Sequence, residues 1–525
     1  MLKGLKITNF KPFGDCQPIR LAPITLVYGP NSSGKSSIIQ SLLLMRQTLS
    51  NRHHAGKRQL VTNGEFVDLG GFLSLVHKHE SRLKLILDYD FSENISAIRS
   101  EFVKGISLQF GAHSNNSASL EANLEKIRFG AIDQQRNPIS FSLTRTNNPS
   151  DESNEVYEDE VIDEDELPLK DQFKFDHILK KDLSRFIQLA YYAESRNVRP
   201  GNSIRTIEAI EQNIGVYKNL IDWVRFTSPS LNETDLLSFR QSYQSSEFPG
   251  LNDETNNSIR QDELPSFRQL LIAYQRQLQK TIGGLTYLGP LRASPERIYS
   301  LQTSEINSVG THGQRAIQLL YQNSRTSRGS DSYLERLNSI AQQFEIPYTF
   351  KLTPIAEKIV GEYVVLELHD NRTGVSVSPT DVGFGIGQLL PILIEGLVAS
   401  ERNSNLVCVE QPEIHLHPRL QASLGDFFID SAIPLRQRNS QNNRSRERPV
   451  QWILETHSEA LIMRIQRRIR EKRLLPSDVS VLYVEPSGEQ GSQIKELRLD
   501  ESGEFIDLWP DGFFVEGLQD LLGGY

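Results

Sequence analysis

The stretch VYGPNSSGKSS, residues 27–37, decides the fold of this 525-residue chain. It contains Gly29, Gly34, Lys35 and Ser36 in the spacing G-x-x-x-x-G-K-[ST]. The apolar run PITLVYG leads into it, and SSIIQSLLLMRQTL, with apolar residues at helical spacing, follows it. This spacing between a strand and a helix predicts a phosphate-binding loop.

The chemistry of such a loop indicates the ligand. Its glycines let the backbone N–H groups face phosphate oxygens, and the helix that follows presents its positive end to them. Lys35 would reach the β- and γ-phosphates, and the Ser36 hydroxyl would bind Mg²⁺. We therefore expect ATP and Mg²⁺ as cofactors. The candidate nucleotide-binding residues of the loop are Asn31, Ser32, Ser33, Gly34, Lys35, Ser36 and Ser37.

Strand-like runs occur on both sides of a long middle segment. The first part contains LKGLKITNF and RLKLILDYDF, and the last part contains GLTYLGP, EYVVLELHD, NLVCVEQ, VQWILETH and VSVLYVEP, with helical patterns between them. This alternation predicts a layered α/β core. We expect residues 1–91 and 281–460 to form it. Residues 92–280 would be a mostly helical insertion with an acidic loop at 151–166, and residues 461–525 a small C-terminal region.

The composition excludes some classes of protein. Two cysteines, Cys16 and Cys408, exclude a disulfide framework and a cysteine-rich zinc site. The absence of a signal-like N-terminus and of a long apolar run predicts a cytoplasmic protein with no membrane partner. Removing the ten acidic residues of segment 151–166 changes the net charge from −9 to +1. The overall charge therefore does not decide whether the chain binds nucleic acid.

Four further motifs resemble those of ABC-type ATPases of the chromosome-maintenance (SMC-like) and RecF-like recombination classes. They are ITNFKPFG at 7–14, DVGFGIGQLLPIL at 381–393, VEQPEIHLHP at 409–418 and ILETHSEAL at 453–461. This resemblance implies an ABC-type head, with a P-loop core and an antiparallel β lobe. TYLGPLRASPERIY, ETHSE and WPDGFF are similar to a bacterial subgroup of stand-alone ATPases in anti-phage defence, including Septu-type and retron-associated systems.

The resemblance also implies roles for particular residues. ATP would lie between two head-to-head chains, in a dimer or higher oligomer. Gly383, Gly385 and Gly387 would face the partner's γ-phosphate from a helix starting near Gly387–Gln388. His457 would sense that phosphate, and Glu410 with Ser36 would hold Mg²⁺. Lys11 and Arg292 are weaker candidates for nucleotide or nucleic-acid contacts.

Gln411 occupies the place where such ATPases carry a catalytic glutamate. A glutamine can orient an attacking water but cannot accept its proton. Glu413 is an alternative base if the chain turns at Pro412. The candidate catalytic residues are therefore Glu410, Gln411, Glu413 and His457, and the expected hydrolysis is slow or gated.

Three functions stay open at this point. The first is an ATP-switched subunit that assembles or controls an effector, such as a nuclease, in a defence complex. The second is a RecF-like or Rad50-like DNA-repair ATPase that binds DNA directly, and the third is an ATP-binding scaffold without turnover. Phosphate contacts to DNA or RNA would come from Arg436, Arg438, Arg444, Arg446 and Arg448, and from Arg464, Arg467, Arg468, Arg470, Lys472 and Arg473.

Three further groups of residues have possible chemical or binding roles. His415 and His417 lack the further ligands of a metal site. Glu485 weakly resembles the glutamate of the metal-nuclease domain in the overcoming-lysogenization-defect nucleases, but no D-x-D pair follows it. Near the end of the chain, Trp509, Phe513 and Phe514 would dock a partner or pack in a small core.

Overall fold

A computed structural model describes most of the chain outside residues 146–273. The described residues are 1–50, 60–91, 103–114, 120–132, 138–145, 173–175, 274, 276–301, 306–327, 332–357, 361–402, 404–434, 448–488 and 491–510. The chain divides into two compact units. The first unit comprises residues 1, 12–43 and 280–525, and the second comprises residues 2–11 and 44–279.

The first unit is built on a sheet in which the described strands follow the order β17-β16-β3-β15-β14-β9. These strands are β3 (Ile24–Tyr28), β9 (Thr286–Leu288), β14 (Leu406–Glu410), β15 (Gln451–Glu455), β16 (Val479–Pro486) and β17 (Ser492–Glu496). All neighbouring pairs are parallel except β16 with β17. Every residue of β3, β14 and β15 is buried, as expected of strands covered on both faces.

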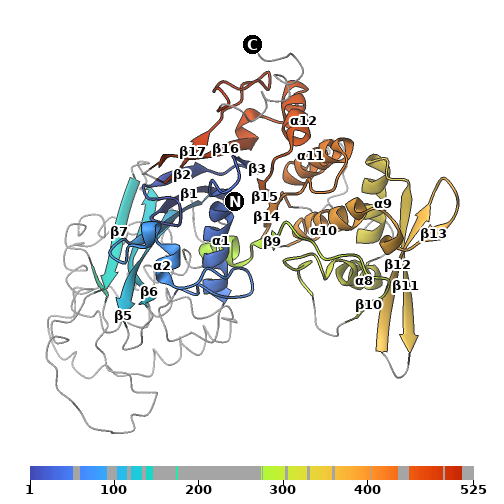
Figure 1. Cartoon of the computed structure of the whole chain (residues 1–525), viewed down its shortest axis with the longest axis horizontal. Coiled ribbons are helices and arrows are strands. Elements are labelled where there is room, and N and C mark those ends of the chain that lie inside the picture. The colour runs from blue at the N-terminus through green and yellow to red at the C-terminus, as the bar shows by residue number, and fades with distance from the viewer. Residues whose placement is uncertain are drawn as a thin grey trace, which may run out of the picture. The chain divides into compact units, whose positions relative to one another are not determined.

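Helices and a second, antiparallel sheet complete this unit (Figure 1). The helices are α8 (Ala316–Thr326), α9 (Tyr333–Gln343), α10 (Phe384–Ala399), α11 (Pro418–Ala432) and α12 (Glu459–Arg470), with short turns η8 (Pro379–Asp381) and η9 (Pro476–Asp478). The second sheet contains β10 (Tyr299–Ser300), β11 (Tyr348–Glu357), β12 (Gly361–Asp370) and β13 (Ser376–Val377). Strand β2 (Gln17–Arg20) is not part of it. One apolar core includes Leu26, Leu393, Val409, Phe428 and Trp452. The expected α/β class is therefore confirmed.

The second unit contains an antiparallel sheet. Its described strands run in the order β1-β4-β5-β6-β7-β8. They are β1 (Leu2–Thr8), β4 (Leu85–Phe91), β5 (Val103–Ser114), β6 (Leu120–Ile132), β7 (Pro138–Arg145) and β8 (Phe173–Phe175). The unit also holds α2 (Phe72–Leu75) and η1 (His77–His79). Helix α1 (Lys35–Ser50) starts in the first unit, and the short helix η6 (Gln279–Gly283) spans the division near residue 280.

This sheet corrects two expectations about the middle of the chain. Strand β4 pairs with β5 from Leu85 to Asp90, so residue 91 is not the end of the sheet. The described residues between 103 and 145 are strands rather than helices, because alternating runs such as ISLQF suit a half-buried strand. The acidic segment 151–166 and the helical patterns between 176 and 273 lie outside the described residues. The described residues 274, 276–278 and Gln279–Gly283, at the end of the last pattern, are helical.

The Trp509 side chain packs against the core of the first unit. Its ring makes edge contacts with Tyr28 at 5.6 Å between centroids, with Phe505 at 5.0 Å and with Tyr483 at 6.2 Å. Trp509 therefore follows the core-packing alternative, while Phe513 and Phe514 lie outside the described residues. In the part of the chain that the structure describes, no helix has both the length and the apolar character needed to cross a membrane.

Candidate nucleotide site

The phosphate-loop stretch forms a turn between β3 and α1. Its backbone has positive φ at Gly29 (144°), Ser32 (62°) and Gly34 (102°). A Cβ atom at Gly29 would lie 2.2 Å from the Val484 carbonyl oxygen, and one at Gly34 would lie 2.5 Å from Pro12 Cγ. Glycine is therefore required at both positions by backbone conformation and by close packing.

Lys35 lies inside the curl of this loop. Its Nζ donates hydrogen bonds to the carbonyl oxygens of Gly29 (3.0 Å) and Pro30 (2.8 Å), and the residue is only 5% exposed. Burial lowers the pKa of the ammonium group, while the nearby Glu455 carboxylate acts in the opposite direction. The loop thus fixes a positive charge at the N-terminus of a 16-residue helix, which is an arrangement suited to anions.

The loop also contains a buried polar atom that lacks a protein partner. Ser33 Oγ is buried and has no hydrogen-bond partner among the described residues. Buried hydroxyl groups normally have a partner, and a phosphate oxygen would supply one here. The Ser33 hydroxyl, Lys35 and the curled backbone together make the loop suitable for binding a nucleotide phosphate.

Two glutamates end neighbouring strands beside the loop. Glu410 is the last residue of β14 and Glu455 the last of β15, and their Cα atoms are partners in the parallel ladder. The two residues are 9% and 5% exposed. Glu455 also pairs with Val27 on β3, and the Ser36 side chain hydrogen-bonds to its carboxylate. Glu410 was expected at this site and Glu455 was not, although both are carboxylates at the end of an apolar strand.

Tyr287 and Arg292 fix the end of β14. The Tyr287 hydroxyl donates to Glu410 Oε1 at 3.0 Å, and the Arg292 guanidinium donates to the backbone carbonyl oxygens of Glu410 (2.8 Å) and Gln411 (2.9 Å). Burial lowers the pKa of Arg292 to about 10. Arg292 therefore binds the turn that carries Gln411, a contact that no local pattern predicts.

Gln411 and Glu413 occupy different positions in that turn. Gln411 has φ of 47°, and its backbone N–H donates to the Glu455 carbonyl oxygen at 2.7 Å. Glu413 accepts hydrogen bonds on both carboxylate oxygens, from the Thr456 hydroxyl and the His457 backbone N–H, each at 2.7 Å. Glu413 thus holds the loop that carries His457, and each of its oxygens already accepts one hydrogen bond from that loop.

His457 is half-buried close to the phosphate loop. Burial, and then the charge of Lys35, lower the pKa of its imidazole, while Glu413 opposes the shift. These causes favour the neutral ring, in which one nitrogen donates and the other accepts a hydrogen bond. Such a ring can report on a phosphate near Lys35 without adding a second positive charge.

The glycine-rich stretch at 383–387 forms the first turn of α10. The helix begins at Phe384 with Gly383 as its N-cap, one turn before the expected start near Gly387–Gln388. A Cβ atom at Gly385 would lie 2.9 Å from the His415 carbonyl oxygen, and one at Gly387 would lie 2.6 Å from Pro295 Cγ. These two glycines are thus packed inside their own chain. Only Gly383 opens to free space, next to the Phe384 side chain, which is 65% exposed.

The magnesium ligands expected from the sequence are Ser36 and Glu410. Mg²⁺ prefers a few protein oxygens together with water and substrate phosphates, so this set fits it. Among the described residues there is no group of three or more His, Cys, Asp or Glu side chains that suits a metal without a nucleotide. His417 caps α11 instead, where its ring accepts the Arg419 N–H at 3.3 Å.

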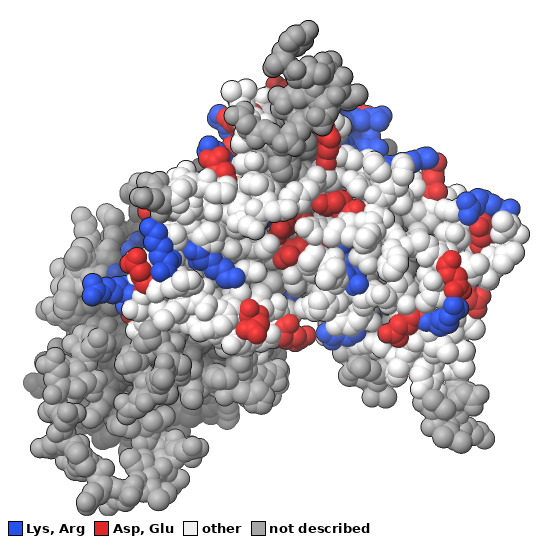
Figure 2. Space-filling view, viewed as in Figure 1, with Lys and Arg blue, Asp and Glu red and all other residues white. Residues whose placement is uncertain are grey.

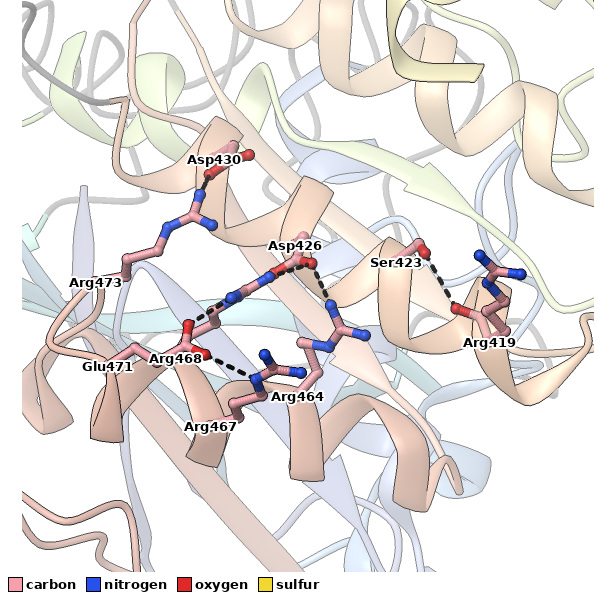
Figure 3. Close-up of polar contacts among 9 residues, drawn as sticks. All are labelled: Arg419, Ser423, Asp426, Asp430, Arg464, Arg467, Arg468, Glu471 and Arg473. Atoms are coloured by element: carbon pink, nitrogen blue, oxygen red, sulfur yellow. Dashed lines mark hydrogen bonds and ion pairs between the residues drawn. The ribbon is translucent and has the colours of Figure 1, made fainter. Parts of the chain in front are cut away.

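The arginines of α12 are bound to acidic side chains (Figure 3). Arg464 and Arg468 both donate to Asp426 of α11, Arg473 donates to Asp430, and Arg467 and Arg468 also contact Glu471. A groove of about 840 Å³ beside them is lined by six arginines, but each is paired or bonded to another group. Arg464 and Arg468 tie α11 to α12 through Asp426. Arg436, Arg438, Arg444 and Arg446 lie outside the described residues.

Charges of both signs are also mixed on the face shown in Figure 2. Lys and Arg alternate with Asp and Glu across its described part, without a continuous basic surface there. Phosphate-backbone binding depends on clustered cations that are free to contact the ligand. The described surface on this side therefore gives little support to a nucleic-acid interface.

The raised pKa of the Glu410 carboxyl predicts that the stability of the protein depends on pH. Burial, and then the neighbouring Glu455, raise the pKa of its carboxyl from an ordinary 4.5 to about 7. The folded protein therefore binds this proton more tightly than the unfolded chain, so stability is highest below pH ~4.5 and is lost as the pH rises through about 7. We expect the unfolding free energy of the nucleotide-free protein to fall by roughly 3 kcal/mol between about pH 5 and 8, and the Tm to fall with it.

The Glu410→Gln variant checks this prediction. It removes the titrating group and keeps the side-chain volume, so thermal melts should show a flatter pH profile. A profile as steep as that of the wild type would assign the pH dependence to other groups.

Several solved structures and one family model are similar to this chain. No curated protein matches the chain. Similar solved structures include an Smc head bound to the C-winged helix domain of ScpA (8% identity, TM-score 0.38, covering 95% of this chain and 98% of the other). Another is an Smc head with an extended coiled coil bound to the C-terminal domain of ScpA from Pyrococcus furiosus (11%, 0.35, 99% and 98%). A third is the SMC head domain from Thermotoga maritima (9%, 0.34, 95% and 99%).

These structural likenesses are remote, and the sequence match is broader. The family model described as "AAA ATPase domain" matches residues 1–462 of the 525. The match includes the phosphate loop, both strand-end glutamates and the loop that carries His457. The chain belongs to the AAA ATPase domain family.

Proposed function

We propose that this chain binds Mg²⁺ and ATP at the phosphate loop, turns the nucleotide over slowly, and uses its occupancy to control a partner protein. The observation that carries the proposal is the residue beside the strand-end carboxylate, which is Gln411 rather than a glutamate. Glu413, the nearest alternative base, has both oxygens engaged by the Thr456–His457 segment. In this proposal, the phosphates of bound ATP fill the phosphate loop. Mg²⁺ neutralises the negative charge of the two buried glutamates.

Slow turnover follows from the chemistry of the turn. A positioned general base contributes about 10²–10⁴ to the rate of such reactions. The Gln411 amide can hold a water by hydrogen bonds but does not take its proton, so that contribution is absent. Orientation and charge stabilisation by Lys35 and the helix N-terminus still act. The expected result is a site that stays occupied between infrequent hydrolysis events.

The dimer is proposed from the N-terminus of α10. Gly383 and Phe384 are open to solvent, and the backbone N–H groups of a helix start attract phosphate oxygens. A second copy that brings its bound ATP to this helix start would complete the site. ATP would then stabilise the closed dimer through its higher affinity for that state.

A Gly383→Trp variant tests the dimer. A Cβ at Gly383 meets no atom within 4 Å, and φ there is −58°, so the chain itself tolerates a side chain. We expect ATP binding to the monomer to be unchanged and the ATP-dependent increase in mass, measured by light scattering, to be lost. Gly385 and Gly387 variants are unsuitable because they would clash within their own chain. Normal dimerisation of Gly383→Trp with ATP would contradict the composite site.

An effector protein is the proposed partner, in a bacterial anti-phage defence complex of the Septu or retron type. The support is the resemblance of TYLGPLRASPERIY, ETHSE and WPDGFF to that subgroup. Glu485 pairs with Lys495 across the β16–β17 hairpin at 2.5 Å, so its role is accounted for without nuclease chemistry. Co-purification from the native operon, followed by nuclease assays across an ATP titration, tests this part. Effector activity that is the same with ATP, with a non-hydrolysable analogue and with neither would contradict it.

A further inference from the structure

We propose that Glu455 is a second carboxylate ligand in the coordination shell of the metal ion that accompanies the nucleotide, beside Ser36 and Glu410. The proposal rests on the proposed nucleotide site and adds one residue to it. No motif in the sequence analysis assigned a role to Glu455.

The position of Glu455 in the sheet is the first argument. Strand β15 lies between β3, which leads into the phosphate loop, and β14, which ends in Glu410. In this parallel sheet all three strands end at the same edge, and the register places Glu455 next to both Val27 and Glu410. Glu455 is therefore nearer to the loop along the sheet than Glu410. Its hydrogen bond with Ser36 brings it to the hydroxyl expected to bind the metal.

The burial of Glu455 is the second argument. The residue is 5% exposed, and its Oε2 atom is buried without a hydrogen-bond partner among the described residues. Leaving a buried carboxylate oxygen unpaired is costly, so such an atom indicates a missing ligand. Lys35 is the neighbouring cation, but its Nζ already donates to the carbonyl oxygens of Gly29 and Pro30.

The closeness of a second carboxylate is the third argument. The Cα atoms of Glu410 and Glu455 are partners in the parallel ladder, and the charge of Glu455 disfavours ionisation of Glu410. Tyr287 donates one hydrogen bond to Glu410, which does not remove that repulsion. A divalent cation bound by both groups would offset two negative charges at once, and oxygen ligands are what Mg²⁺ and Mn²⁺ prefer. A purely structural role at this buried strand end would be served better by an uncharged side chain.

The test measures metal binding directly, with Mn²⁺ as the probe. Free Mn²⁺ is followed by electron paramagnetic resonance in the presence of a non-hydrolysable ATP analogue, for the wild type and for Glu455→Gln. We expect the variant to bind Mn²⁺ at least about tenfold more weakly, in the range found when groups that support a metal site are removed. Binding of the analogue in EDTA should be as tight as in the wild type, because no metal is present to lose.

Glu485→Gln is the matched control. Glu485 lies near the end of β16, on the other side of β3 in the same sheet, and is paired with Lys495. Its neutralisation should leave the Mn²⁺ affinity unchanged. A decrease equal to that of Glu455→Gln would mean that any lost charge at this sheet weakens the metal, and the assignment of Glu455 would be wrong.

A stability measurement separates the metal role from a structural one. Neutralising Glu455 removes its repulsion with Glu410, so the Tm of Glu455→Gln in EDTA should equal or exceed that of the wild type. A lower Tm together with unchanged Mn²⁺ affinity would show that the carboxylate serves the fold, and would overturn the proposal. Glu455→Asp, which keeps the charge, provides the comparison if Glu455→Gln folds poorly, and it should bind Mn²⁺ more tightly than Glu455→Ala. Failure of the wild type to bind the analogue would instead reject the nucleotide site itself.

Discussion

Lys35→Ala is expected to lower ATP affinity by at least about 100-fold. The Lys35 ammonium is the cation held inside the phosphate loop, and contacts between a charged donor and phosphate oxygens are worth roughly 1.5–3 kcal/mol each. Two such contacts account for about 3 kcal/mol, and each 1.4 kcal/mol is a factor of ten. Isothermal titration calorimetry with Mg²⁺–ATP measures the loss.

Lys3→Ala is the control for this experiment. Lys3 is an exposed lysine on β1, so its removal changes the net charge equally without touching the loop. The variant Lys35→Ala leaves the Gly29 and Pro30 carbonyl oxygens without this donor, so a thermal melt should accompany the titration. A folded Lys35→Ala protein that binds ATP as tightly as the wild type would show that the nucleotide binds elsewhere.

Gln411→Glu is expected to raise steady-state phosphate release at least about tenfold. The substitution exchanges an amide for a carboxylate of nearly the same shape. It therefore adds no backbone strain at residue 411, where φ is 47°. The new carboxylate can accept the proton of the attacking water, an effect worth about 10²–10⁴ when the base is well placed. The gain should lie at the lower end, because Glu410 and Glu455 nearby disfavour a third negative charge.

Gln411→Ala completes this comparison. It removes the amide that orients water and introduces no base, so phosphate release should fall below that of the wild type. If Gln411→Glu is no faster than the wild type, slow turnover does not arise at residue 411. Wild-type turnover above roughly 10 s⁻¹, about the median for enzymes, would contradict the holding role itself.

Local patterns predicted the elements that depend on neighbouring residues. The strands β3, β4, β12, β14, β15 and β16 and the helix α1 all appear where apolar runs and helical spacing place them. The loop glycines were also predictable, since the motif fixes both backbone conformation and helix start. For β5 and β6 a period-two pattern was present, but the polar character of the surrounding segment favoured a helical interpretation.

The sequence by itself determined the phosphate loop and the replacement of a glutamate by Gln411, because each lies in a short contiguous motif. It also determined the α/β class, because each strand and helix has its own local pattern. Only the tertiary structure decided that Glu455 stands beside Glu410 and Ser36, since this depends on the register of strands 45 residues apart in the chain. It likewise showed that Glu413 holds the His457 loop and that Arg464 and Arg468 of α12 are bound to Asp426 of α11. Hydrogen bonds and ion pairs between distant segments form only when packing brings their partners together, and no local pattern records which partner a charged side chain will meet.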